Sequence, residues 1–152
     1  MKGKIFFISG PSGVGKGTLV YALKKRHPEW VFPPSYSTRA MRKGEVQGDP
    51  YFFVSVAEFQ AKLDRGEFLE YAHVHGTDFY GTDRDSLLTP AKRGQIVVKE
   101  FDVQGYQQVM ETMKKSLYTS IFLNVSGGAD ELIQRIKGRS EMSEEELNSI
   151  RE

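Results

Sequence analysis

A glycine-rich turn that ends in a lysine is the part of this sequence best suited to chemistry. Gly10, Gly13 and Gly15 separate the apolar run Ile5–Ile8 from Lys16. Such glycines let successive backbone N–H groups converge on phosphate oxygens, and the lysine adds a mobile positive charge. A helix that begins here directs its positive end at the same place. The segment therefore predicts a phosphate-binding loop between a strand and a helix.

The residue after Lys16 departs from the usual form of this loop. The common pattern places a Mg²⁺-binding Ser or Thr directly after the lysine. This sequence has Gly17 there, and Thr18 comes one position later. We expect the Thr18 hydroxyl to take the metal-binding role.

A second cluster combines guanidinium groups with hydroxyls. Arg39 and Arg42 follow Ser35 closely, and Tyr51 lies downstream. Bidentate guanidinium contacts and O–H donors at this spacing could hold a second phosphate. From the residues alone, a solvated basic turn explains the cluster equally well.

Two carboxylates end the apolar segment that begins at Ile96. Glu100 and Asp102 occupy the last positions of this buried-type strand. In phosphate-loop proteins, an acidic residue at such a strand end lies opposite the loop and holds Mg²⁺ or its waters. Glu100 and Asp102 are therefore candidate metal ligands.

Apolar runs alternate with helical patterns along most of the chain. This alternation predicts a parallel sheet with flanking helices. The expected strands are 4–9, 95–101 and 120–125, and the expected helices that follow them are 18–26, 103–115 and 129–137.

The middle of the chain breaks this rhythm. Short aromatic strands at 51–54 and 68–74 surround a helical pattern at 56–64. Ser55 and Glu58 form a capping-box signature at the start of that helix. The pattern predicts a mixed α+β lobe inserted into the parallel core.

Composition limits the partners of the chain. Its 152 residues carry 21 Lys and Arg against 20 Asp and Glu, for a net charge of +1, so no overall field recruits nucleic acid or a membrane. The absence of cysteine excludes disulfides and thiolate metal sites. The chain opens into a strand without an apolar leader and has no apolar run of membrane-spanning length. We therefore expect a cytoplasmic protein.

These segments, taken in order, resemble the guanylate kinases, a family of nucleoside-monophosphate kinases. The segment 37–55 follows the family's Ser-Thr-Arg-x-x-Arg-x-Gly-Glu pattern and continues to its Tyr-x-Phe-Val-Ser end. Further matching blocks are 10–16, 67–72, 79–82 and 102–105, together with Leu132, Arg135 and Arg139. The resemblance covers essentially the whole chain.

The resemblance implies an α/β fold of the P-loop NTPase type in a single guanylate-kinase-like domain, 1–152. The core would comprise about 1–34 and 94–137, the GMP-binding lobe about 35–93, and a helical lid about 138–152. The family's final strand and helix have no counterpart in this sequence, so we expect the ATP side to be affected more than the GMP side.

The implied activity is Mg²⁺-dependent transfer of the γ-phosphoryl group of ATP to GMP. The resemblance implies GMP and ATP as partners and a monomer or weak homodimer. The implied ATP-binding residues are Gly10, Pro11, Ser12, Gly13, Val14, Gly15, Lys16, Gly17 and Thr18. The implied catalytic cations are Lys16, Arg39 and the lid arginines Arg135, Arg139 and Arg151.

The resemblance also implies how GMP is read. Glu70 would accept from the N1–H and N2–H₂ of guanine, and the Thr82 hydroxyl would meet O6. The residues that would hold the monophosphate are Ser35, Arg39, Arg42, Tyr51 and Tyr80, with Glu45 beside them, and Glu100 and Asp102 complete the GMP site.

Two other classes of protein agree less well with these residues. A non-catalytic guanylate-kinase-like interaction module would bind phosphorylated or acidic partners, but such modules typically lack the loop lysine, and Lys16 is present. A dinucleotide-binding dehydrogenase needs Gly-x-Gly-x-x-Gly, and after Gly13 and Gly15 the final position is Thr18.

Overall fold

Three parallel strands form the central sheet that positions the phosphate loop. In this computed structural model, which describes residues 2–74 and 78–138, the strand order is β6 (Ile96–Phe101), β1 (Lys4–Ser9) and β7 (Thr119–Phe122). Strand β1 pairs with β6 so that Ile8 lies opposite Glu100. Parallel strands end at the same edge of a sheet, so the loop after β1 and the carboxylates that end β6 lie together.

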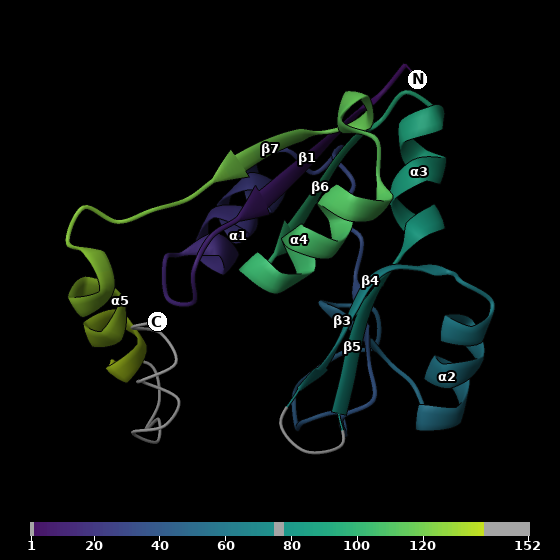
Figure 1. The fold of residues 1–152 in the computed structure, drawn as a ribbon, viewed down its shortest axis with the longest axis horizontal. Helices are drawn as coiled ribbons and strands as arrows, with labels where there is room; N and C mark the ends of the chain where they lie inside the picture. Colours follow the sequence, from purple (N-terminus) through teal and green to yellow (C-terminus); the bar gives the residue numbers. More distant parts are fainter. Residues whose placement is uncertain (1, 75–77, 139–152) are drawn as a thin grey trace.

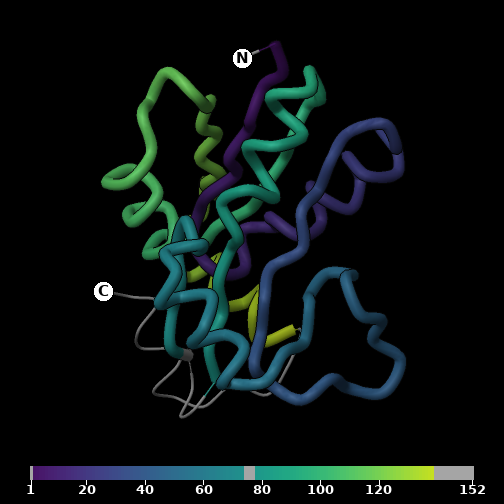
Figure 2. Tube along the Cα trace, turned by 90° about the vertical axis from the view of Figure 1, so that its right-hand side faces the viewer, coloured from purple at the N-terminus to yellow at the C-terminus, as the bar shows by residue number. Residues whose placement is uncertain are grey.

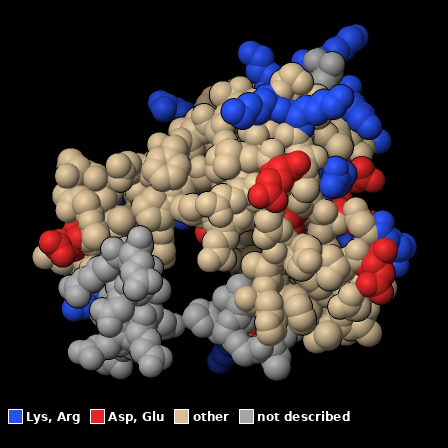
Figure 3. Space-filling view, in the orientation of Figure 1, with Lys and Arg blue, Asp and Glu red and all other residues tan. Residues whose placement is uncertain are grey.

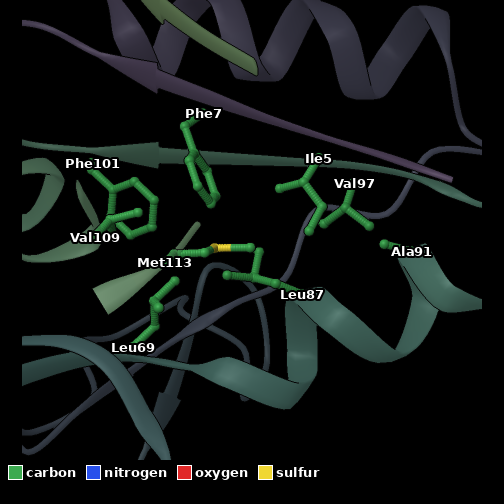
Figure 4. Packing of buried hydrophobic residues seen from close by; sticks show 9 residues of the cluster. All are labelled: Ile5, Phe7, Leu69, Leu87, Ala91, Val97, Phe101, Val109 and Met113. Atoms are coloured by element: carbon green, nitrogen blue, oxygen red, sulfur yellow. The ribbon is translucent and has the colours of Figure 1, made fainter. Parts of the chain in front are cut away.

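Helices cover both faces of this sheet (Figure 1). Helix α1 (Lys16–Arg26) lies on one face, and α4 (Val103–Thr112) lies on the other with α3 (Arg84–Lys92). The hydrophobic core lies between the sheet and α3 with α4 (Figure 4). There Ile5 and Phe7 of β1 contact Leu87 of α3 and Val109 of α4 within one cluster.

The second sheet belongs to a smaller lobe and has mixed pairing. Its strand order is β3 (Tyr51–Phe53), β2 (Ser35–Ser37), β5 (Asp78–Asp83) and β4 (Phe68–Val74). Strands β2 and β3 are parallel, and the other pairs are antiparallel. In Figure 2, the chain between β2 and β3 loops out to one side of this lobe.

Helix α2 (Val56–Asp64) packs its one fully buried residue, Phe59, into this lobe. The Phe59 ring stacks on Phe68 at 4.4 Å and on Phe79 at 5.4 Å between centroids. The predicted capping box is present, because the Ser55 hydroxyl accepts from Glu58 N and the Glu58 carboxylate accepts from Ser55 N. The lobe therefore has its own aromatic core.

The predicted α/β class is confirmed, but several element boundaries differ. Helix α4 ends at Thr112 rather than 115, because Met113 takes an extended conformation and packs into the core; a short 3₁₀ turn follows at Lys115–Leu117. Strand β7 is shorter than expected. Helix α5 (Gly128–Lys137) agrees closely with the expectation and buries Leu132, Ile133 and Ile136.

Three elements were not predicted: β2, β5 and α3. Helix α3 contains Pro90, a residue that normally discourages a helix interior. It forms because the Asp83 carboxylate accepts from Asp85 N and Ser86 N, and because Leu87 and Ala91 are fully buried. Packing against the core therefore outweighs the local signal.

Replacing Ser55 with alanine tests the contribution of the capping box. We expect Ser55→Ala to lower the free energy of unfolding by about 1 kcal/mol, because Glu58 N loses its acceptor. Urea denaturation measures the change. The matched control is Ser116→Ala, at an exposed serine with no side-chain hydrogen bond in the described part of the chain. Equal midpoints for the two variants would contradict the prediction.

Candidate active site

Close packing around the loop after β1 requires glycine at two positions. Gly10 has φ of 151°, and a Cβ there would lie 2.6 Å from the Leu123 carbonyl oxygen. Gly13 has φ of 80°, and a Cβ there would lie 2.6 Å from the Ile136 side chain. The residue that follows β7 and helix α5 therefore pack directly against the predicted phosphate loop.

Lys16 folds back over this loop. Its Nζ donates to the Gly10 carbonyl at 2.7 Å and to the Pro11 carbonyl at 3.1 Å. Burial lowers the pKa of the Lys16 ammonium, and the charges of Glu100 and Asp102 act in the opposite direction. The structure therefore brings the predicted lysine and the predicted carboxylates of β6 into one electrostatic neighbourhood.

An open groove of about 740 Å³ lies beside the loop. Thr18 and Arg135 both line it, and Arg135 also pairs with Glu131 at 2.5 Å. A Cβ at Gly17 would meet no atom within 4 Å, so nothing in the described fold excludes a side chain there. Arg139 and Arg151, the other predicted lid cations, lie outside the described residues.

A second cavity, of about 340 Å³, lies between the core and the small lobe. Figure 3 shows the molecule hollowed beneath the core, between α5 and the lobe. Six of the predicted GMP-site residues line the cavity. They are Ser35, Tyr51, Glu70, Tyr80, Glu100 and Asp102.

Arg39, Arg42 and Glu45 form a separate unit beside this cavity. The Glu45 carboxylate accepts from Arg39 at 2.5 and 2.8 Å and from Arg42 N at 2.7 Å. The hydrogen bond from Arg39 lowers the pKa of Glu45 to about 2. The Arg39 guanidinium lies over the ring of Tyr51, 5.4 Å from its centroid. Glu45 therefore fixes Arg39 against one wall of the cavity.

Thr82 lies beside Glu70, because the two residues are opposite each other in the pairing of β5 with β4. Thr82 is fully buried, and its hydroxyl acts to lower the pKa of the Glu70 carboxyl against the larger effect of burial. Glu70 is part of the cavity lining, and Thr82 is its immediate neighbour. The structure therefore brings the two predicted base-reading side chains together.

Glu70 lies against the first turn of α4. A Cβ on Gly105 would come within 3.0 Å of Glu70 Oε2 and 3.2 Å of Asp102 Oδ1. Asp102 caps this helix by accepting from Gly105 N at 2.6 Å. Burial raises the pKa of the Glu70 carboxyl. Gly105 is a site residue to which the sequence analysis gave no role: its missing side chain leaves room for Glu70.

Lys99 is a second cavity residue without a sequence-derived role. It lines the cavity from β6 and is only 7% exposed. Its signal in the sequence is a lysine in the interior of an apolar strand.

The donors present fit a magnesium ion bound mainly through substrate. Within residues 2–74 and 78–138, no cluster of three or more His, Asp or Glu side chains could hold a metal alone. Mg²⁺ commonly takes one or two carboxylates together with substrate phosphates. Glu100 and Asp102 supply oxygen donors of this kind near Lys16.

None of the helices in the described part of the chain is both long and apolar enough to cross a membrane.

Comparison with known proteins gives a consistent result. The family model described as guanylate kinase matches residues 2–151. The guanylate kinase of Trichormus variabilis is 43% identical over 145 residues, which cover 95% of this chain and 71% of that protein. The guanylate kinase of Clostridium tetani is 40% identical, over 96% of this chain and 68% of its own length. A crystal structure of guanylate kinase from Anaplasma phagocytophilum superimposes with a TM-score of 0.65 at 35% identity, covering 90% of this chain and 68% of that one.

Proposed function

This chain belongs to the guanylate kinase family and is an ATP:GMP phosphotransferase, and on that premise we propose how its residues divide the work. ATP binds in the groove beside the phosphate loop, and GMP binds in the cavity between core and lobe. One observation carries this assignment: Glu100 lines the cavity while its charge acts on Lys16 of the loop. The two sites therefore meet at the carboxyl ends of β1 and β6.

The reaction needs little acid–base chemistry from side chains. The acceptor is a phosphate monoester with a second pKa near 6, so it is already mostly a dianion at neutral pH. The protein must instead bring two polyanions together and stabilise the charge on the transferred group. Lys16 and Arg135 supply positive charge from the ATP side, and Arg39 and Arg42 supply it from the GMP side.

Tyr51 and Tyr80 extend the monophosphate end of the cavity. The two rings contact edge to face, with centroids 5.6 Å apart, and burial raises the pKa of Tyr51. Each phenol carries an O–H group that can be donated to a phosphate.

Mg²⁺ would be held by Thr18, Glu100 and Asp102, partly through water, and would neutralise charge on the ATP phosphates. Thr18 is exposed at the start of α1 and lines the ATP groove.

A coupled assay tests the assignment of substrates. Turnover with ATP–Mg²⁺ and GMP should greatly exceed turnover with AMP, CMP or UMP, because a site with buried polar groups rejects a base that leaves them unpaired. Comparable rates with GMP and AMP would contradict the proposal.

Replacing Glu70 with glutamine should remove the preference for guanine. At about 100 times its dissociation constant, GMP should stabilise the wild-type protein by about 2.7 kcal/mol. In Glu70→Gln, the thermal shift with GMP should fall towards that with AMP, because an amide cannot accept from both N1–H and N2–H₂, while the shift with ATP should stay unchanged. Glu111→Gln, at an exposed site on α4, is the matched control. A GMP shift that survives in Glu70→Gln would exclude Glu70 from base reading.

Replacing Gly105 with alanine should displace the carboxylate of Glu70. We expect Gly105→Ala to raise the KM for GMP several-fold, because the new Cβ would crowd Glu70 Oε2 at 3.0 Å. Thermal stability should change little, because the higher helix propensity of alanine, about 1 kcal/mol, acts against the cost of this close contact. Steady-state kinetics with each substrate varied provide the measurement, and the KM for ATP is the internal control. Equal increases in both KM values would point to general damage instead.

Lys16 should matter for turnover and little for folding. We expect Lys16→Met to lower kcat by about 10²-fold or more, because the lost charge stabilises the transition state. The melting temperature should change little, since the ammonium contacts only loop carbonyls. The control is Lys25→Met, at an exposed position on the same helix. Near-normal turnover in Lys16→Met would rule out the phosphate-loop role.

A further inference from the structure

A lysine is buried in the wall of the proposed GMP cavity. Lys99 lies in β6 between Val98 and Glu100, and 7% of its surface is exposed. A buried ammonium is destabilising unless hydrogen bonds and opposite charges compensate for its lost hydration. The hydrogen-bond partners and neighbouring charges of Lys99 therefore indicate the role of this ammonium group in the cavity.

The contacts of Lys99 determine whether a neighbouring hydroxyl accepts or donates a hydrogen bond. Its Nζ donates to the Pro33 carbonyl at 2.8 Å and to Ser35 Oγ at 2.7 Å. An ammonium has no acceptor capacity, so Ser35 Oγ must accept in this pair. Ser35 then has its own O–H available, and the described residues offer no hydrogen-bonded acceptor for it. Because Ser35 and Lys99 both line the cavity, that O–H can donate into it.

The charges around Lys99 act on Glu70 as well. Burial lowers the pKa of Lys99 to about 8, opposed by the charges of Glu70 on β4 and Glu100 on β6 and reinforced by Lys24 on α1. The charge of Lys99 in turn favours the ionised form of Glu70. It lowers the pKa of Glu70, whereas burial raises that pKa. An ionised carboxylate only accepts hydrogen bonds.

We propose that Lys99 is a positioning residue that sets the base specificity of the cavity, by making the Ser35 hydroxyl a donor and Glu70 an acceptor. A 6-oxopurine presents an acceptor, O6, next to a donor, N1–H, which complements this pair. The proposal therefore assigns the Ser35 hydroxyl to the base and not to the monophosphate, where the family resemblance had placed it. Adenine presents the reverse order, N6–H₂ beside an N1 lone pair. The inference rests on the proposed assignment of this cavity to GMP and extends it: the selected class is 6-oxopurine nucleotides, with IMP second to GMP because it lacks N2–H₂.

The variant Lys99→Met tests the proposal, because methionine has a similar length without charge or donors. At neutral pH we expect the KM for GMP to rise about tenfold or more, with kcat within about twofold of wild type. The ratio of kcat/KM for GMP to that for AMP should fall by a similar factor, and IMP should follow GMP. The control is Lys92→Met, at an exposed lysine at the end of α3.

A double-mutant cycle with Ser35→Ala identifies the route of the effect. If Lys99 acts through Ser35, Lys99→Met should change the GMP:AMP ratio much less in the Ser35→Ala background than in wild type. Additive effects would overturn the route through Ser35. A lower melting temperature with an unchanged GMP:AMP ratio in Lys99→Met would overturn the proposal and leave Lys99 only tying the Pro33–Ser35 segment to β6.

Two further results keep the test decisive. If Lys99→Met does not fold, Ser35→Ala alone tests the same route, because loss of the donated O–H should lower the GMP:AMP ratio of kcat/KM. A wild-type protein with no preference for GMP over AMP would overturn the assignment of the cavity itself, whereas a preference that survives in Lys99→Met would overturn only the role of Lys99.

Discussion

The parallel pairing of β1 with β6 is the constraint on which the rest of the site depends. Ile8 lies opposite Glu100 in this register, so the phosphate loop and the β6 carboxylates share one edge of the sheet. Phosphoryl transfer between two polyanions requires concentrated positive charge, yet the chain has a net charge of only +1. The fold resolves this by placing Lys16 and Arg135 at the loop, while Arg39 of the small lobe lies beside the cavity.

In the proposed assignment, selectivity for the base depends on two charges whose burial is destabilising. Glu70 and Lys99 lie in a region where burial disfavours the charged form of each, and each favours the charged form of the other. A site built this way gains discrimination because a base with the wrong donor order leaves buried groups without partners. The same opposition of charges explains why Lys99 is tolerated at a buried position of β6.

Helix α4 connects the proposed base site to the hydrophobic core. Its first turn leaves space for Glu70 at Gly105, and further along the helix Gln108 pairs with the backbone of Tyr71 on β4 at 2.9 and 3.1 Å. Val109, the next residue of the helix, is fully buried in the core cluster. The lobe has its own aromatic core, so these α4 contacts set the position of β4, and with it Glu70, relative to the phosphate loop.

The sequence by itself determined the features that depend on near neighbours in the chain. The turn between β1 and α1, strands β1, β4 and β6, and the capping box at Ser55 were all predicted, because glycine conformations, hydrophobic periodicity and capping are local signals. The tertiary structure decided the features that depend on distant residues. It forms α3 despite Pro90 because Leu87 and Ala91 enter the core, and it pairs Thr82 on β5 with Glu70 on β4. It also places Lys99 on Ser35, 64 residues away in sequence, and Gly105 behind Glu70. Which polar groups face each other in a buried cavity is set by long-range strand pairing and packing, and no local pattern contains that information.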